Sequence, residues 1–125
     1  MRLDLIAALR QVRARAPRAK IVLIGYPEIL PASGRCLKAG SSTVARARAE
    51  LNRIATAQRK AARAAGVAFL DPRGVTRGHG LCTDDPWIAV ASTATSQQFH
   101  PLVQEQQAIA AVLERLVGAR TVSRD

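Results

Sequence analysis

His100 is the residue whose type and position best suit catalysis in this chain, which contains two histidines. A neutral imidazole has a pKa of about 6.5, so it can accept and return a proton near neutral pH. Pro101 follows it, and proline is favoured at the first position of a helix, where its missing N–H is not needed. The sequence therefore places His100 at the start of a predicted helix over residues 102–117, as a general base or as a helix cap.

A catalytic histidine needs a nucleophile, an acceptor that orients its second nitrogen, and donors for a developing oxyanion. A carboxylate three residues earlier would suit the orienting role, but that position holds Gln97. A backbone carbonyl near Gln97 can take this role, because the requirement is to fix the imidazole tautomer. Ser41 and Ser42 stand near a turn-to-helix junction, but nothing around them marks a nucleophile, and we interpret them as helix-capping residues.

The two cysteines, Cys36 and Cys82, both fall in predicted loops. They either form a disulfide, as in an oxidising compartment, or remain two unrelated thiols. On the chain-entropy model such a disulfide would stabilise the fold by about 4 kcal/mol. No Cys-x-x-Cys motif is present, and His79 stands between two glycines, which is typical of a tight turn. We therefore predict no metal site and no cofactor.

The composition narrows the class of protein. Of the 125 residues, 48% are hydrophobic and only 3% are aromatic, which indicates a globular chain with an aliphatic core. The net charge of +10 permits a nucleic-acid binder, but the basic residues are spread over several segments and base-stacking aromatics are nearly absent. We therefore favour arginines on solvated helix faces. The chain has no apolar run of about 18 residues, as a membrane span would need, and its first residues do not follow the signal-peptide pattern.

The apolar spacing predicts the elements that position these residues. Three helices are expected over residues 3–12, from Ser42 or Thr43 to about residue 65 with Gly66 as its C-terminal cap, and over residues 102–117. Continuous apolar runs predict a strand buried on both faces at 21–26 and a second short buried strand at 67–70, with a long loop at 71–98. This alternation predicts an α/β fold with parallel strands. Two parallel strands do not form a stable sheet alone, so further strands are expected from another chain or from a larger domain.

Five short segments occur in an order that resembles the C-terminal part of the SGNH (GDSL) hydrolases, and above all the secreted actinobacterial lipases and esterases. They are residues 21–27 (IVLIGYP), 66–71 (GVAFLD), 78–82 (GHGLC), 86–87 (PW) and 99–101 (FHP). The resemblance covers most of the chain and implies a three-layer α/β/α flavodoxin-like fold, of which only the C-terminal part is present. It implies a partial domain over residues 1–118 and a loose tail over residues 119–125.

The resemblance also implies roles for single residues. His100 matches the family's catalytic histidine. Gln97 stands where many members have aspartate, while some members of this branch use a main-chain carbonyl there. Cys36 and Cys82 match half-cystines of the secreted enzymes, which implies a disulfide between them.

Other positions bear on the substrate and on completeness. Trp87 matches a tryptophan in the loop before the histidine, which implies that Trp87 and Phe99 line the substrate pocket. The family often has a glycine in the turn after His-Pro, whereas residues 103–105 provide none. The family's Gly-Asp-Ser nucleophile motif, its oxyanion glycine and its Gly-x-Asn motif are all absent from this sequence.

The resemblance therefore implies the C-terminal part of a serine ester hydrolase that supplies the catalytic histidine. We expect it to be inactive alone and to act on small-molecule or lipid esters when an N-terminal half completes it. The resemblance and the cysteine pair imply secretion, although no signal peptide is seen. If the protein is not secreted, we expect it in the cytoplasm. The alternative is a non-catalytic truncated relative that binds a partner or forms a homo-oligomer through an exposed sheet edge.

Overall fold

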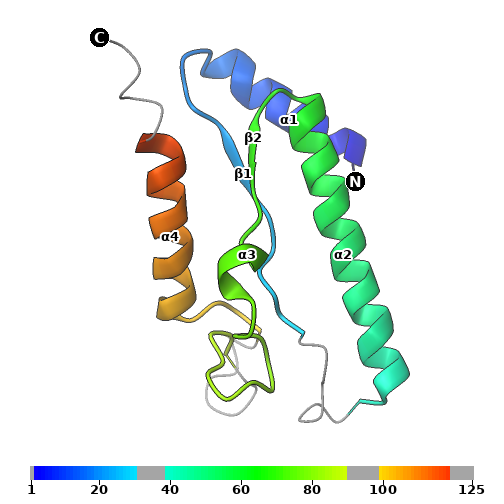
Figure 1. Cartoon of the computed structure of the whole chain (residues 1–125). Helices are drawn as coiled ribbons and strands as arrows, with labels where there is room; N and C mark the ends of the chain where they lie inside the picture. The colour runs from blue at the N-terminus through cyan, green and yellow to red at the C-terminus, as the bar shows by residue number, and fades with distance from the viewer. Residues whose placement is uncertain (1, 31–38, 90–98, 119–125) are drawn as a thin grey trace.

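The structure, a computed structural model, describes residues 2–30, 39–89 and 99–118. Helices and strands follow one another in an order that agrees with the predicted α/β class (Figure 1). The elements are α1 (Arg2–Arg15), β1 (Val22–Ile24), α2 (Ser41–Ala64), β2 (Ala68–Leu70), α3 (Arg73–Thr76) and α4 (Val103–Gly118).

The two strands form a parallel sheet, as predicted, with Val22 opposite Ala68 and Ile24 opposite Leu70. The pairing continues past β1, because the Gly25 N–H donates to the Leu70 carbonyl at 2.9 Å. The prediction that the first strand is buried on both faces is wrong for this chain, since Ile24 is 39% exposed. Among the described residues β1 pairs along one edge only, and the packed helices leave the face that carries Ile24 partly open to solvent.

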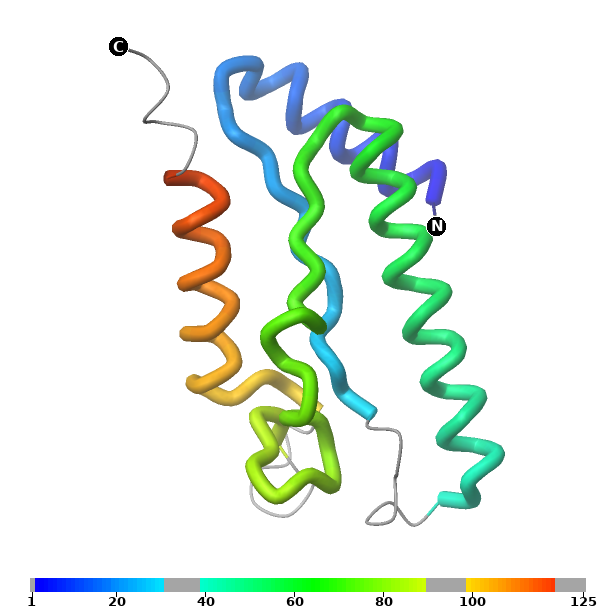
Figure 2. The backbone as a smooth tube through the Cα atoms, viewed as in Figure 1, coloured from blue at the N-terminus to red at the C-terminus, as the bar shows by residue number. Residues whose placement is uncertain are grey.

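The helices form layers on either side of the strands. In Figures 1 and 2, α2 lies on one side of the strand pair and α4 on the other. Helix α1 packs against α2 and buries Leu9, while Leu3 and Val12 remain exposed. The described part of the chain is therefore a narrow α/β/α arrangement, which confirms the predicted fold class.

Helix α2 begins two or three residues earlier than capping by Ser42 or Thr43 would give. Its N-cap is Gly40, whose carbonyl accepts the N–H groups of Thr43 and Val44 at 2.9 and 3.1 Å. Ser42 and Thr43 already lie inside the helix, and no side chain caps its first turn. The capping role predicted for Ser41, Ser42 or Thr43 is therefore wrong, because an extended glycine leads directly into the first turn.

The C-terminus of α2 ends as predicted at Gly66, which has a left-handed φ of +66°. The Gly66 N–H donates to the Arg63 carbonyl and the Val67 N–H to the Ala62 carbonyl, at 3.2 and 3.0 Å. This pair of bonds is the Schellman motif, which satisfies the last carbonyls of the helix and needs a residue without a Cβ at the left-handed position. The helix packs through small side chains and buries Ala55, Ala61 and Ala62.

Helix α3 was not predicted and lies inside the expected long loop. Asp71 and Pro72 explain it, because the Asp71 carboxylate accepts the Arg73 N–H at 3.2 Å and Pro72 has a φ of −68°, which is compatible with a helix start. The side chain of Thr76 is buried and accepts the Glu28 N–H at 3.0 Å, which fixes α3 against the segment after β1.

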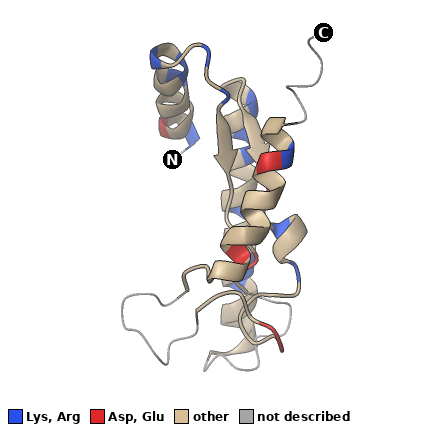
Figure 3. Ribbon diagram, turned by 90° about the vertical axis from the view of Figure 1, so that its left-hand side faces the viewer, with Lys and Arg blue, Asp and Glu red and all other residues tan. Residues whose placement is uncertain are grey.

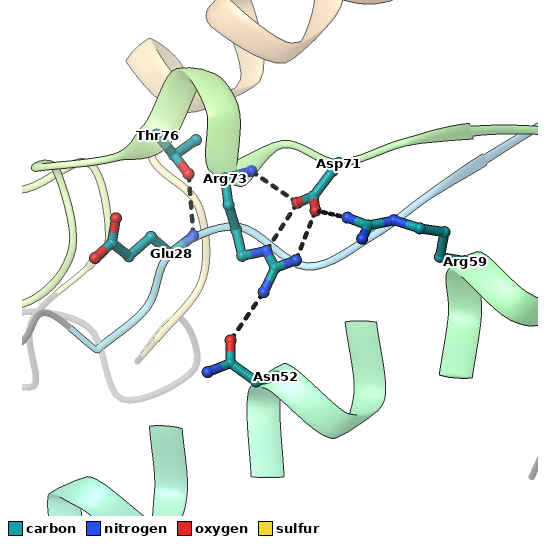
Figure 4. A network of polar contacts seen from close by, with 6 residues as sticks. All are labelled: Glu28, Asn52, Arg59, Asp71, Arg73 and Thr76. Carbon is teal, nitrogen blue, oxygen red and sulfur yellow. Dashed lines mark hydrogen bonds and ion pairs between the residues drawn. The ribbon is translucent and has the colours of Figure 1, made fainter. Parts of the chain in front are cut away.

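A polar network joins α2 to the turn after β2 (Figure 4). The Asp71 carboxylate accepts two hydrogen bonds from the Arg73 guanidinium, at 2.8 and 2.6 Å, and one from Arg59 at 2.6 Å. Arg73 also donates to the Asn52 side chain at 2.9 Å. The hydrogen bonds from Arg73 hold the pKa of Asp71 below its ordinary value, although partial burial opposes them.

The turn at Gly80 approaches the segment after β1 closely. The Leu81 N–H donates to the Ile29 carbonyl at 2.8 Å. A Cβ on Gly80 would lie 2.9 Å from that carbonyl oxygen and 3.0 Å from the Glu28 carbonyl oxygen. Only glycine permits this backbone contact, which holds the loop that contains His79 against the segment after β1.

Surface charge is distributed over several elements. Figure 3 shows Lys and Arg on α1, α2, α3 and α4, so the basic residues are spread over the described part of the chain. No helix in the described ranges combines the length and the hydropathy that a membrane crossing requires.

Candidate active site

The backbone of residues 99–102 is paired with that of residues 87–89. The Ala89 N–H donates to the His100 carbonyl at 2.9 Å, and the Phe99 N–H donates to the Ala89 carbonyl at 3.0 Å. Two residues, Phe99 and His100, therefore oppose the single residue Ala89, and Phe99 is left-handed, which is the geometry of a G1-type β-bulge in an antiparallel pair. It fixes the backbone of His100 while its side chain remains exposed to solvent.

The same pairing determines where α4 begins. The Leu102 N–H donates to the Trp87 carbonyl at 2.7 Å, and the Leu102 carbonyl accepts the Gln106 N–H at 3.2 Å. Leu102 is therefore the residue that precedes the helix, which begins at Val103. The prediction that Pro101 takes the first helical position is wrong, because Pro101 forms an antiparallel bridge with Ile88. The histidine before it is not a helix cap.

Phe99 has a φ of 64°, in the left-handed region that non-glycine residues rarely adopt. Its side chain is 51% exposed, and it is next to His100 on the surface. Gln97, whose carbonyl is predicted to orient the imidazole, lies outside the described residues. The orienting group therefore remains a prediction.

Trp87 is held by the second histidine. The rings of His79 and Trp87 stack with centroids 3.7 Å apart and an interplanar angle of 10°. Asp85 contacts both rings, since its carboxylate accepts the indole N–H at 3.0 Å and lies 3.2 Å from the His79 Nδ1, which is also 3.0 Å from the Asp85 carbonyl oxygen. The Trp87 N–H donates to the His79 carbonyl at 2.8 Å. We call this group, His79, Asp85 and Trp87, the ring clamp.

The ring clamp agrees with a structural interpretation of His79. Sequence reasoning missed Asp85, although an acidic residue between a histidine and a tryptophan was visible as Asp85-Pro86-Trp87. Trp87 was expected to line a substrate pocket, and its indole face towards His79 is covered. The backbone carbonyl of Trp87 also accepts the Leu102 N–H, so the clamp connects directly to the segment that carries His100.

Cys82 follows the close turn at Gly80 and has a left-handed φ of 67°. Its predicted partner, Cys36, lies outside the described residues, so the pairing remains a prediction. Among the residues that the structure describes, no three His, Cys, Asp or Glu side chains gather in a way that could hold a metal ion.

Glu105 is fully buried in the first turn of α4, in the stretch where the sequence lacks the expected glycine. Both of its carboxylate oxygens lack a hydrogen-bond partner among the described residues. Burial raises the pKa of Glu105 from 4.5 to about 7, because the charged form loses its hydration. Sequence reasoning noted the missing glycine but not the burial of the acid that stands there.

Comparison with known proteins relates this chain to lipases. No protein-family model matches it. A lipase from Streptomyces rimosus is 32% identical over 98 residues, which is 76% of this chain and 36% of the relative. Lipase 2 from Streptomyces coelicolor is 42% identical over 83 residues, which is 60% of this chain and 27% of the relative.

Solved structures give the same relationship. The crystal structure of the extracellular lipase from Streptomyces rimosus superposes with a TM-score of 0.83 and 26% identity, over 90% of this chain and 49% of that one. A phospholipase A1 from Streptomyces albidoflavus superposes with a TM-score of 0.76 and 30% identity, over the same shares. These comparisons support the resemblance to the SGNH-type lipases and esterases. The chain resembles their C-terminal portion, and it spans about half the length of the solved relatives and about a third of the curated ones.

The burial of Glu105 makes the stability of the folded chain depend on pH. An unfolded Glu105 ionises near pH 4.5 and the folded one near 7, so ionisation lowers the free energy of unfolding progressively across that interval. We expect Glu105→Gln to raise the melting temperature above pH 7 by on the order of 5 °C, and to leave it nearly unchanged at pH 4. Thermal melts at both pH values measure this, with Glu114→Gln, an exposed acid of α4, as the control. Equal shifts of the melting temperature at the two pH values would contradict the raised pKa of Glu105.

The ring clamp predicts a spectroscopic signature, because Trp87 is the only tryptophan of the chain. We expect His79→Ala to remove most of the near-UV circular dichroism of Trp87, since a stacked indole loses its fixed environment. The same change should cost about 0.5–1.5 kcal/mol of folding free energy. His100→Ala is the matched control. The hydrogen bond described above between His100 and Ala89 comes from the His100 backbone, and the alanine variant keeps it. An unchanged tryptophan signal in His79→Ala would refute the stack.

Proposed function

We propose that this chain supplies the catalytic histidine of a serine ester hydrolase, and that His100 is that residue. The support is the kinship with proteins named lipase and phospholipase A1, together with the exposed side chain of His100 on a backbone fixed by antiparallel pairing. Such a base has an accessible ring on a hydrogen-bonded main chain, and general-base catalysis also needs the nucleophile within hydrogen-bond reach of that ring.

In the proposed reaction, a serine supplied by a segment corresponding to the relatives' remaining half attacks the ester carbonyl. His100 takes the serine proton as the serine oxygen bonds to the carbonyl carbon, and then gives that proton to the departing alcohol. Water, deprotonated by His100, next releases the carboxylic acid and restores the serine. The carbonyl near Gln97 holds the imidazole in the required tautomer, and Trp87 and Phe99 border the substrate.

We propose further that Cys36 and Cys82 form a disulfide and that the protein acts outside the cell. The Streptomyces rimosus relative is described as extracellular, and Cys82 is not a free thiol. A disulfide would tie the loop after β1 to the loop before His100, and such bonds persist in oxidising compartments. The proposed domain covers residues 1–118, with residues 119–125 as a tail.

A second candidate function is a non-catalytic module that self-associates through β1. The observation in its favour is the strand edge itself. Within the described residues β1 pairs along one edge, and Ile24 on the strand and Tyr26 just after it are both exposed. Unpaired backbone groups and apolar side chains on an edge are a template for strand addition from another copy.

We expect the purified chain alone to hydrolyse p-nitrophenyl butyrate no faster than buffer, because its sequence has neither a Gly-Asp-Ser nucleophile nor the family's oxyanion motifs. The measurement is p-nitrophenolate release at neutral pH. Turnover that disappears in His100→Ala would contradict the claim that the chain is inert by itself.

The role of His100 is tested in a chimera, in which residues 21–118 replace the matching part of the Streptomyces rimosus lipase. In a chimera that melts cooperatively and hydrolyses the ester, we expect His100→Ala to lower kcat by roughly 10³-fold or more. Arg115→Ala, an exposed change on α4, is the control and should leave kcat unchanged. A His100→Ala chimera with full kcat would exclude His100 as the base.

Self-association through β1 is tested by placing a charge on the strand. If β1 is the contact, size-exclusion chromatography should show a dimer or larger species for the natural chain and a monomer for Ile24→Lys, because lysine on an edge strand opposes strand addition. Val12→Lys, on the exposed side of α1, should behave like the natural chain. A natural chain that is monomeric and melts cooperatively counts against this function.

A further inference from the structure

The first turn of α4 distributes its side chains in an unusual way. Glu105 is the one fully buried residue of this helix, while the apolar residues Ile109, Val112 and Leu116 are only half-buried. Within the described part of the chain, the largest fully buried side chains are Leu81, Ile88, Glu105, Thr76 and Pro72. Glu105 is the only member of this group that can ionise.

The position of Glu105 explains why its carboxyl group lacks a partner. Glu105 is the third residue of the helix, counted from Val103, and a glutamate there commonly accepts the N–H of the residue before the helix. Here that N–H belongs to Leu102 and donates to the Trp87 carbonyl at 2.7 Å. The Glu105 side chain is buried instead, and both of its oxygens lack a hydrogen-bond partner among the described residues.

The elements around this turn do not compensate a charge on Glu105. Helix α3 packs against α4 (Figure 1), and its single titratable residue, Arg73, is bound to Asp71 and Asn52. Residues 87–89 and both strands carry no titratable side chain. The other titratable groups nearby in the sequence are Arg77, His79, Asp84, Asp85 and His100, with Glu114 and Arg115 farther along α4. None of these groups contributes to the raised pKa of Glu105, because burial is its only cause.

The His100 segment, residues 99–102, depends on the same turn. It is paired with residues 87–89 by backbone hydrogen bonds, and it ends at Leu102, whose carbonyl accepts the Gln106 N–H in the first turn of α4. Phe99, at the other end of the segment, has a left-handed φ of 64°, which persists only where neighbouring bonds enforce it. The segment is therefore held between the pairing and the first turn of α4, and the loss of either attachment favours its release.

We propose that Glu105 is a pH-operated switch for the order of the His100 segment. With a neutral carboxyl group, α4 stays packed on α3 and the segment stays paired with residues 87–89. A buried carboxylate would lack both hydration and a partner, so ionisation favours an open state in which the first turn of α4 leaves α3 and Glu105 contacts water. The segment then separates from residues 87–89 while the strand pair remains intact. This switch goes beyond ester hydrolysis, because it concerns the order of the segment and not the chemistry of His100.

The test is amide hydrogen exchange of the full chain, measured by NMR at about pH 5 and about pH 8 and expressed as protection factors. We expect protection of the Phe99 and Leu102 amides to fall by roughly 10- to 100-fold between these pH values, because ionisation of Glu105 stabilises the open state. In Glu105→Gln, which cannot ionise, protection should change by less than about 3-fold. Glu114→Gln, an exposed acid of the same helix, is the matched control and should behave like the natural chain.

The urea dependence of exchange in the natural chain shows whether the opening is local, and it needs no variant. At about pH 8 and low urea, the Phe99 and Leu102 amides should lose protection with a smaller slope than the strand amides of Gly25 and Ala68. The reason is that partial opening exposes less surface than unfolding of the whole chain.

Four results would overturn the proposal. Two concern the natural chain alone, namely equal protection of the segment at both pH values and equal urea slopes for the segment and strand amides. The third is an undiminished fall in Glu105→Gln, which is also the result expected if the response arose from His79. The fourth is a loss of the response in Glu114→Gln. None of these readouts uses ester hydrolysis, so they stand whether or not His100 is the catalytic base.

Discussion

Three residue pairs of parallel β structure hold the described part of the molecule together. The strands Val22–Ile24 and Ala68–Leu70 pair in parallel. The two segments that follow them, although far apart in the sequence, therefore leave the sheet at the same edge. The segment after β1 can therefore accept the Leu81 N–H and meet Thr76, and the turn after β2 can reach α2 through Asp71. A shift of one residue in the strand register would separate all of these partners at once.

The elements that depend on local pattern could be predicted from the sequence. The helices α1, α2 and α4 follow from apolar spacing, and the end of α2 follows from Gly66, whose left-handed φ is the reason for a glycine there. The starts of helices were harder to place. Gly40 displaced the expected hydroxyl caps, and Pro101 entered a bridge with Ile88 instead of the helix, because tertiary pairing outweighed the local preference of proline.

The missed features are those that depend on contacts between distant residues. Helix α3 rests on the Asp71 carboxylate, and the same carboxylate binds an arginine from the far end of α2. The sequence assigned all the arginines to solvated surfaces. In the structure, Arg59 binds Asp71 and Arg73 binds Asn52, and both contacts join α2 to the turn after β2. The stack of His79 on Trp87 was equally hidden, since residue spacing carries no information about ring planes. For the candidate site, the histidine was therefore predictable by type, while its supporting contacts were not.

The left-handed backbone at Phe99 has a consequence for recognition. A non-glycine residue in this region is disfavoured by about 1–3 kcal/mol, so it persists only where neighbouring bonds enforce it. Here the exchange of hydrogen bonds with Ala89 on either side of the Phe99–His100 peptide does so. The main chain that carries the imidazole is thus ordered by folding and not by its ligand. When a ligand binds at His100, the entropy cost of ordering the His100 backbone has already been met by folding. This favours affinity without any additional contact.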